Sequence, residues 1–434
     1  MDIPYTKHSL PNGLDVLVHT DRHLPMVAVS VWYHVGSKNE RPGRTGFAHL
    51  FEHLMFEGSA HHPGGYFPPL QRAGALLNGS TNPDRTNYWE VVPTGALDLA
   101  LWMESDRMGH LLPAITEERF QNQRDVVLNE RRQNYENRPY GMSGIAISAA
   151  LFPPGHPYHW PTIGSPDDLN ASTLEEVHDF FRRYYHPANA SLALAGDIDE
   201  AEGIALAERY FGDIPAGVRP APVRAAAALA EERRLVLEDR VELPRLYFGW
   251  LTAAMFEPGD AELDLAADLL ANGKTARLYQ TLVYERRVAL DVSAAQQSRE
   301  MAGFFVLAVT AAPGASLTEL AAAVDEEIRR LEADGPTTAE MERAEAQAEA
   351  QFVYHLQTVG GFGGKSDQLN AYNVLRGDPG YFSRDLDRYR LATRESVRDA
   401  ARRYLSLDRR VVLSAVPRGR ASDALPGSVP VAVS

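Results

Sequence analysis

Residues 21–25 read Asp21-Arg22-His23-Leu24-Pro25 and stand directly before an apolar run at 26–33. A similar stretch, Asp239-Arg240-Val241-Glu242-Leu243-Pro244, precedes a second apolar run at 246–250. Other matched segments recur at an offset of roughly 220 residues, and a fixed offset is the signature of an internal repeat. The sequence therefore predicts two similar domains.

Local patterns predict both strands and helices in the first copy. The runs 14–18 and 26–33 are rich in β-branched and aromatic residues, which favour strands. The segments 97–111 and 116–135 carry apolar residues at helical spacing. This mixture indicates an α+β fold in which each domain is a mostly antiparallel sheet packed with helices.

Chain length and composition suggest where the two domains meet. A chain of 434 residues exceeds what a single hydrophobic core usually supports. The stretch 217–231 is rich in Pro and Ala and shows little periodicity, as expected for a linker. We expect homologous domains at 1–216 and 232–434.

Charge and cysteine content exclude several classes of partner and site. The net charge of −15 argues against nucleic acid or an anionic membrane as partner. Because Cys is absent, neither disulfides nor thiolate ligands are available. No apolar run reaches the roughly 18 residues of a membrane-spanning helix. No signal peptide is visible, so we expect a cytoplasmic protein, or a periplasmic one if the chain is a processed form.

The segment His49-Leu50-Phe51-Glu52-His53 carries the clearest chemical signal. Residues four apart share a helix face, so His49 and His53 can bind one metal ion with Glu52 beside them. This H-x-x-E-H order is the inverted form of the commoner zinc-protease motif. The surrounding segment is apolar nearly all round and predicts a buried helix, in which unpartnered polar groups would be costly. The motif does not recur in the second copy.

A third ligand is needed, because catalytic zinc usually has three protein ligands and an open position for water. Glu130 is the best candidate, since it follows an apolar run on the predicted helix 116–135. The alternative is an ordinary solvated glutamate on a helix surface. We expect His61 and His62 to be surface loop residues.

Taken together, these motifs resemble those of the pitrilysin-like zinc metallopeptidases, the inverzincins. The chain is most similar to their half-length branch, which includes the mitochondrial processing peptidase beta subunit and bacterial processing-peptidase-like proteins. Members of this branch pair to close a chamber, so the resemblance implies that one chain forms half of a clamshell. The similarity covers nearly the whole chain and rests on six segments: 49–53, 78–81, 84–88, 157–164, 185–189 and 195–197.

The resemblance implies a role for each matched residue. His49, His53 and Glu130 would ligate one Zn²⁺ per chain, and Glu52 would be the general base. The substrate peptide would add as a strand to a sheet edge formed by Asn78, Gly79, Ser80 and Thr81.

Two departures from the family pattern affect the expected site. Relatives often carry a second Glu seven residues before the third ligand, where this chain has Gln123, which can orient a neighbour but cannot ionise. An Arg and a Tyr that contact the substrate in single-chain relatives are replaced by Val283 and Leu290. A small misalignment would instead place Arg286 or Tyr284 there.

These observations lead to a functional hypothesis with two rivals. We expect a zinc-dependent endopeptidase that hydrolyses peptides or unfolded segments in an enclosed chamber. A homologous partner subunit would supply the missing Arg and Tyr in a heterodimer, and a homodimer is the alternative. The rivals are a non-catalytic structural subunit of a peptidase-like complex and a module that binds peptides without cleaving them.

Overall fold

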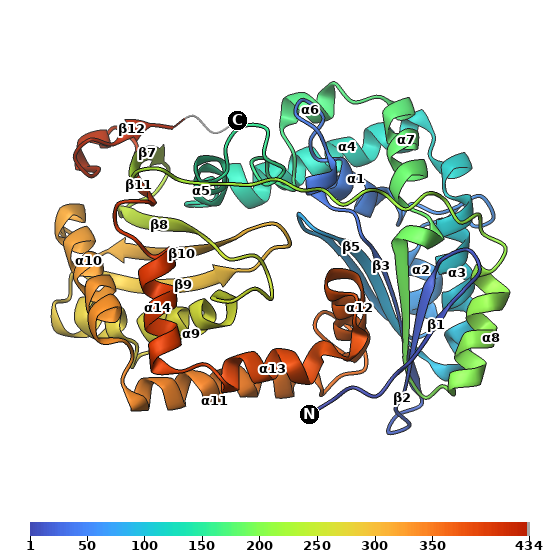
Figure 1. Ribbon diagram of the computed structural model, residues 1–434. Coiled ribbons are helices and arrows are strands. Elements are labelled where there is room, and N and C mark those ends of the chain that lie inside the picture. The colour runs from blue at the N-terminus through green and yellow to red at the C-terminus, as the bar shows by residue number, and fades with distance from the viewer. Residues whose placement is uncertain (432–434) are drawn as a thin grey trace. The chain divides into compact units, whose positions relative to one another are not determined.

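The computed structural model describes residues 1–431, so 432–434 of the expected second domain lie outside the described residues (Figure 1). The chain forms two compact units, each built around a six-stranded sheet. The first unit contains 1–129, 161–223 and 351–384. The second unit contains the intervening segments 130–160 and 224–350, together with the chain from 385 onward.

The two units are therefore interleaved in the sequence, whereas we expected contiguous domains at 1–216 and 232–434. Segment 217–231 has no helix or strand, and the chain passes from the first unit to the second within it, between Val223 and Arg224. The departure from contiguity comes from 130–160 and 351–384, each of which packs with the sheet of the other half of the sequence.

The first sheet has the strand order β1-β2-β6-β3-β5-β4. Only β2 and β6 run parallel, and the other neighbours are antiparallel. All of β6 is buried, because it lies between β2 and β3 in the middle of the sheet. The strands are β1 (Thr6–Ser9), β2 (Asp15–Thr20), β3 (Met26–Tyr33), β4 (Leu76–Thr81), β5 (Thr86–Pro93) and β6 (Ala190–Gly196).

Helices cover both faces of this sheet. In Figure 1, α12 lies on one side of the sheet and α3 and α8 lie on the other. The remaining helices of the unit include α1, which carries the histidine motif. The helices are α1 (Phe47–Leu54), α2 (Phe67–Arg72), α3 (Leu97–His110), α4 (Glu117–Arg131), α6 (Pro166–Asn170), α7 (Leu174–Tyr184), α8 (Glu200–Phe211) and α12 (Lys365–Arg376).

Polar contacts hold α12 on the first sheet. Asp367 accepts hydrogen bonds from Trp32 Nε1 at 2.8 Å and from Asn87 Nδ2 at 3.0 Å. Asn370 Nδ2 donates to the carbonyl of Ser30 at 2.9 Å. The preceding turn approaches so closely that a Cβ at Gly360 would lie 2.5 Å from the Cβ of Ala28. Glycine at 360 thus lets a segment from late in the sequence complete the first unit.

The second sheet repeats the pattern of the first, with the order β12-β7-β11-β8-β10-β9. Its parallel pair, β7 and β11, corresponds to β2 and β6, and β8, β10 and β9 correspond to β3, β5 and β4. The outer strand differs, because β12 follows β11 in the sequence and runs parallel to β7. The strands are β7 (Arg233–Asp239), β8 (Arg245–Thr252), β9 (Ala289–Gln297), β10 (Gly303–Ala311), β11 (Val411–Pro417) and β12 (Val429–Pro430).

The helices of the second unit pack against its sheet and one another. Helix α5 packs on β8 and β11, and α9 and α10 both contact α14. Helices α4, α11 and α13 each contain a point at which the chain passes from one unit to the other. The bounds are α5 (Ser143–Leu151), α9 (Asp260–Ala271), α10 (Leu317–Asp334), α11 (Thr338–His355), α13 (Phe382–Arg390) and α14 (Arg394–Tyr404).

The predicted fold class is confirmed: the protein is α+β, with two similar arrangements of mostly antiparallel strands and packed helices. The helix expected at 116–135 is α4 followed by a π-helical turn, Arg132–Glu136. Among the described residues, no helix combines the length and apolar character needed to cross a membrane.

Candidate metal centre

Helix α1 presents the motif because its apolar side is fixed in the core. Phe51 stacks on Phe180 and Tyr185, with ring centroids 5.5 and 5.2 Å apart, and is fully buried. His49, Glu52 and His53 are half-buried on the other side of the helix. Apolar burial thus orients three polar side chains away from the core.

A half-buried acidic side chain also fixes the start of α1. Glu40 accepts hydrogen bonds from the backbone N–H of Gly46 at 3.0 Å and of Ala48 at 2.8 Å. These bonds satisfy donors that are otherwise unpaired in the first turn of a helix. Burial raises the pKa of Glu40 to about 8, even though the backbone bonds favour the charged carboxylate.

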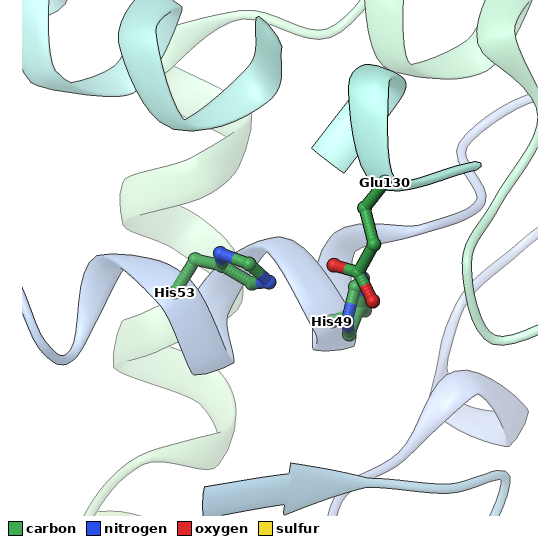
Figure 2. A group of neighbouring side chains, drawn as sticks. All are labelled: His49, His53 and Glu130. Atoms are coloured by element: carbon green, nitrogen blue, oxygen red, sulfur yellow. The ribbon is translucent and has the colours of Figure 1, made fainter. Parts of the chain in front are cut away.

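The two histidines and Glu130 converge in space. Their ligand atoms lie within 4.8 Å of one another, and the His49 and His53 rings are 4.8 Å apart at 78°. Figure 2 shows Glu130 reaching from the last turn of α4 toward His49, with His53 on the same helix as His49. Asn134 Nδ2 donates to Glu130 Oε1 at 3.2 Å. The predicted ligand trio is therefore assembled by the fold.

The donor set fits a zinc ion. Two imidazole nitrogens and one carboxylate are ligands that Zn²⁺ prefers when an open position is kept for water. Tetrahedral ligands about 2 Å from zinc are roughly 3.3 Å apart, so small side-chain rotations would close the trio onto one ion.

A pocket of about 400 Å³ adjoins the trio. Glu52 and His53 line it from α1, and Asn78 lines it from β4. Residues 65–68, from the loop before α2 and its first turn, also line it, and Gln123 contributes from α4. The predicted base, one predicted ligand and one predicted substrate residue thus share a single cavity.

Gln123, which the sequence singled out, is hydrogen-bonded to Glu57, which it did not. Gln123 Nε2 donates to Glu57 Oε1 at 2.7 Å, and both side chains line the pocket. The pocket therefore contains a carboxylate beside Gln123, and that carboxylate belongs to Glu57. The available signal was its position four residues after His53, just beyond the end of α1.

The predicted substrate strand lies at the edge of its sheet. Strand β4, which contains Asn78, Gly79, Ser80 and Thr81, pairs with β5 alone, and α1 packs beside it. A Cβ at Gly79 would lie 3.1 Å from the Phe56 and Tyr88 rings, so glycine permits this close approach. An edge strand offers unpaired backbone groups to an incoming peptide.

A buried charge cluster beneath α1 was not anticipated from the sequence. Arg107 contacts Glu104 through both Nε, at 3.0 Å, and Nη2, and it lies between the rings of Tyr66 and Tyr88. Its Nη1 also reaches the carbonyl of Met55 at 3.5 Å. Burial and the nearby Glu104 raise the pKa of Glu90 well above its ordinary value. The only signal was the Glu104–Arg107 spacing along α3.

The residues at the expected Arg and Tyr positions offer no hydrogen-bond donors. Val283 packs against the core of the second unit, and Leu290 is 52% exposed on β9. Of the alternative residues, Arg286 pairs with Glu326 at 2.9 Å and Tyr284 is exposed.

Comparison with known proteins places this architecture in a family. Residues 15–149 match the family model "Insulinase (Peptidase family M16)", and 171–348 match "Peptidase M16 inactive domain". The chain belongs to the M16 peptidase family. The pitrilysin-like resemblance inferred from the motifs is thereby confirmed.

Similar proteins within this family include a zinc protease, PqqE, from Helicobacter pylori, 28% identical over 87% of this chain and 86% of the relative. The chain is also similar to a protease from Helicobacter pylori whose crystal structure is known, with a TM-score of 0.87 and 25% identity. That match covers 96% of this chain and 100% of the Helicobacter pylori chain. The periplasmic protease PqqL from Escherichia coli shares the fold, with a TM-score of 0.78 and 18% identity. The match covers 98% of this chain and 50% of PqqL.

Proposed function

We propose that this M16 chain is the zinc-bearing subunit of an endopeptidase that hydrolyses peptides or unfolded polypeptide segments. The observation that carries the proposal is the convergence of His49, His53 and Glu130 beside a pocket lined by Glu52. The name of the relative PqqE, a zinc protease, supports zinc as the ion.

The proposed chemistry assigns distinct tasks to the residues. His49, His53 and Glu130 would hold Zn²⁺, which supplies Lewis acidity that makes water easier to deprotonate and a carbonyl easier to attack. Glu52 accepts a proton from the attacking water and delivers it to the leaving amide nitrogen. Water adds to the carbonyl carbon, the C–N bond breaks, and an acid and an amine are released.

Substrate recognition would use the edge of the first sheet. An extended peptide that pairs with β4 gains backbone hydrogen bonds, which place few demands on its sequence. Asn78 lies both on this strand and in the pocket beside Glu52, so the strand would guide a peptide to the reacting groups. We therefore propose a broad preference for unstructured peptides.

A partner subunit is proposed to complete the site. Val283 and Leu290 cannot donate hydrogen bonds to a substrate carbonyl. The chain matches half the length of PqqL, a protein that carries two such lengths in one polypeptide. We propose a heterodimer with a homologous chain that supplies the Arg and Tyr, with a homodimer as the alternative assembly.

The second candidate function is a structural or peptide-binding subunit without catalysis. The match of 171–348 to a domain described as inactive favours it, as do the apolar residues at 283 and 290. This candidate retains the β4 edge for binding but assigns no turnover to Glu52.

One experiment separates these functions. The purified chain is incubated with Zn²⁺ and an unstructured peptide, alone and with a homologous chain that lacks the motif, and products are identified by mass spectrometry. We expect cleavage that depends on the partner. Full cleavage by the chain alone contradicts the need for a partner. Peptide binding without cleavage in either mixture contradicts the peptidase proposal and supports the second candidate.

A further inference from the structure

A second cluster of metal-binding side chains lies outside the candidate metal centre. His61 is on the loop that joins α1 to α2, and Asp106 and His110 are four residues apart in the last two turns of α3. One ligand atom from each of the three residues lies within 4.8 Å of the others. No sequence motif announced this cluster, because His61 is far from the other two residues along the chain.

The imidazole pair in this cluster has the same geometry as the pair on α1. The His61 and His110 ring centroids are 4.8 Å apart at 78°, and the His49 and His53 rings give the same two values. The donor set is also the same, with two imidazoles and one carboxylate. Such a set suits Zn²⁺ and similar transition metals, with water completing the coordination.

Burial distinguishes this cluster from chance neighbours on the surface. Asp106 is only 4% exposed, whereas the His61 side chain is 60% exposed and His110 is exposed. The carboxylate accepts hydrogen bonds from the Ser59 hydroxyl and from the His61 backbone at 3.3 Å, and its Oδ1 lies 2.5 Å from His61 Nδ1. A buried carboxylate is therefore held in place below two imidazoles that an ion can reach from solvent.

We propose that His61, Asp106 and His110 form a second binding site for a divalent transition metal such as Zn²⁺. The ion takes the place of the hydrogen bond between Asp106 and His61 and recruits His110 as the third ligand. The chain thus binds two metal ions instead of the one expected from its sequence, and His61 is a ligand as well as a surface loop residue.

The position of the site gives the second ion a structural role. The loop that carries His61 continues into 65–68, which forms one wall of the pocket beside Glu52. Its ends are tied near α1, since Tyr66 N–H donates to the carbonyl of Phe56 at 2.9 Å. Ala60 N–H donates to the carbonyl of His110 at 2.9 Å, so the loop already touches the end of α3. A bound ion fastens the middle of the loop to α3 and thereby steadies the pocket wall.

The site can be tested independently of catalysis. The test uses a metal-free His49→Ala/His53→Ala chain, which lacks the first site. Its binding of Zn²⁺ is measured by titration, and its binding of Co²⁺ is measured by absorption spectroscopy. We expect one equivalent to bind. Adding His61→Ala or His110→Gln should weaken this binding at least as much as the roughly 10- to 100-fold cost of losing an outer partner of a zinc ligand.

A matched control uses the neighbouring His62, which is outside the cluster and lies against Trp102. In the same background, His62→Ala should leave the one bound equivalent unchanged, and thermal melting of the metal-free variants shows whether each one folds. No binding by the His49→Ala/His53→Ala chain overturns the proposal, as does binding that His61→Ala and His110→Gln both leave intact. Because peptide cleavage is not the readout, these outcomes are separate from a failure of the proposed peptidase function.

Discussion

Helix α1 in the first unit and helix α9 in the second follow equivalent strands, β3 and β8. The polar residues of the two helices nevertheless make different kinds of contact. On α1, His49 and His53 converge with Glu130 beside a pocket. On α9, Asp260, Asp264 and Asp268 also repeat every four residues, but each one has a partner within the second unit.

The partners on α9 are specific. Asp260 pairs with Arg388 at 2.8 Å, and Asp264 accepts a hydrogen bond from the Tyr389 hydroxyl at 2.8 Å. Asp268 accepts one from Asn272 Nδ2, also at 2.8 Å. The repeated fold therefore offers a helix after the equivalent strand twice, but the α1 residues line a pocket whereas the α9 aspartates are bonded to neighbouring side chains. Duplication of a scaffold does not by itself duplicate a site.

The largest expected effect concerns the support beneath α1. Arg107→Met leaves Glu104 and Glu90 buried without a cation, and breaking a buried ion pair in this way typically costs about 3–5 kcal/mol. We expect a loss of that size in the free energy of unfolding, measured by urea denaturation. Arg209→Met, at an exposed ion pair with Asp98, is the control and should change stability by less than about 1 kcal/mol. A cost for Arg107→Met as small as that of the control would show that α1 does not depend on the buried cluster.

Substitution of a carboxylate at each helix's site tests the difference between α1 and α9. Glu130→Gln should weaken Zn²⁺ binding at the first site roughly 100-fold, equivalent to about 3 kcal/mol. Asp264→Asn removes a carboxylate from the equivalent helix and should leave metal affinity unchanged. Both are measured by competition with a chelator, in a His61→Ala background that removes the second site. Equal losses in the two variants would contradict the assignment of Glu130, and not Asp264, as a ligand of the first site.

The half-buried carboxylate of Asp264 on α9 predicts a pH dependence. Burial raises the pKa of Asp264 from 3.8 to about 7, in spite of the hydrogen bond from Tyr389. Because the folded state favours the neutral acid, its stabilising contribution is complete below pH 3.8 and is lost as the pH rises through 7. Asp264→Asn should remove this loss, so that the variant gains about 3 kcal/mol relative to the parent between pH 5 and 8. A constant stability difference across this range would contradict the raised pKa.

The smallest effect concerns the hydrogen bond within the pocket. Gln123→Ala frees Glu57 from its partner, and loss of one such bond to a charged group is worth roughly 1–2 kcal/mol. We expect up to about a tenfold loss in kcat/KM for peptide cleavage, with metal content unchanged. Gln121→Ala, on the exposed side of the same helix, is the control. A loss of metal from Gln123→Ala would show that this residue supports the ligands instead of Glu57.

Much of the scaffold was predictable because local patterns encode it. The strands at 15–20 and 26–33 and the helix at 97–110 follow directly from β-branched runs and helical spacing. The i, i+4 spacing of His49 and His53 likewise brings them together once the segment is helical.

The remaining features depend on contacts that periodicity does not specify. An apolar helix face shows that α12 must pack against something, but not that it packs on the first sheet. Glu57 lies beyond the end of α1, so helical spacing could not show that it meets Gln123. The His61–Asp106–His110 cluster needs a loop to fold back onto α3, and no local pattern encodes that path.

The central claim is that Glu52 carries out the proton transfer at a metal site built from His49, His53 and Glu130. The most direct test measures zinc content and peptide cleavage together for Glu52→Gln in the assembled complex. We predict unchanged zinc content and a loss of turnover of roughly 10²- to 10⁴-fold, the usual contribution of a general base. Unchanged turnover with zinc retained would contradict the account.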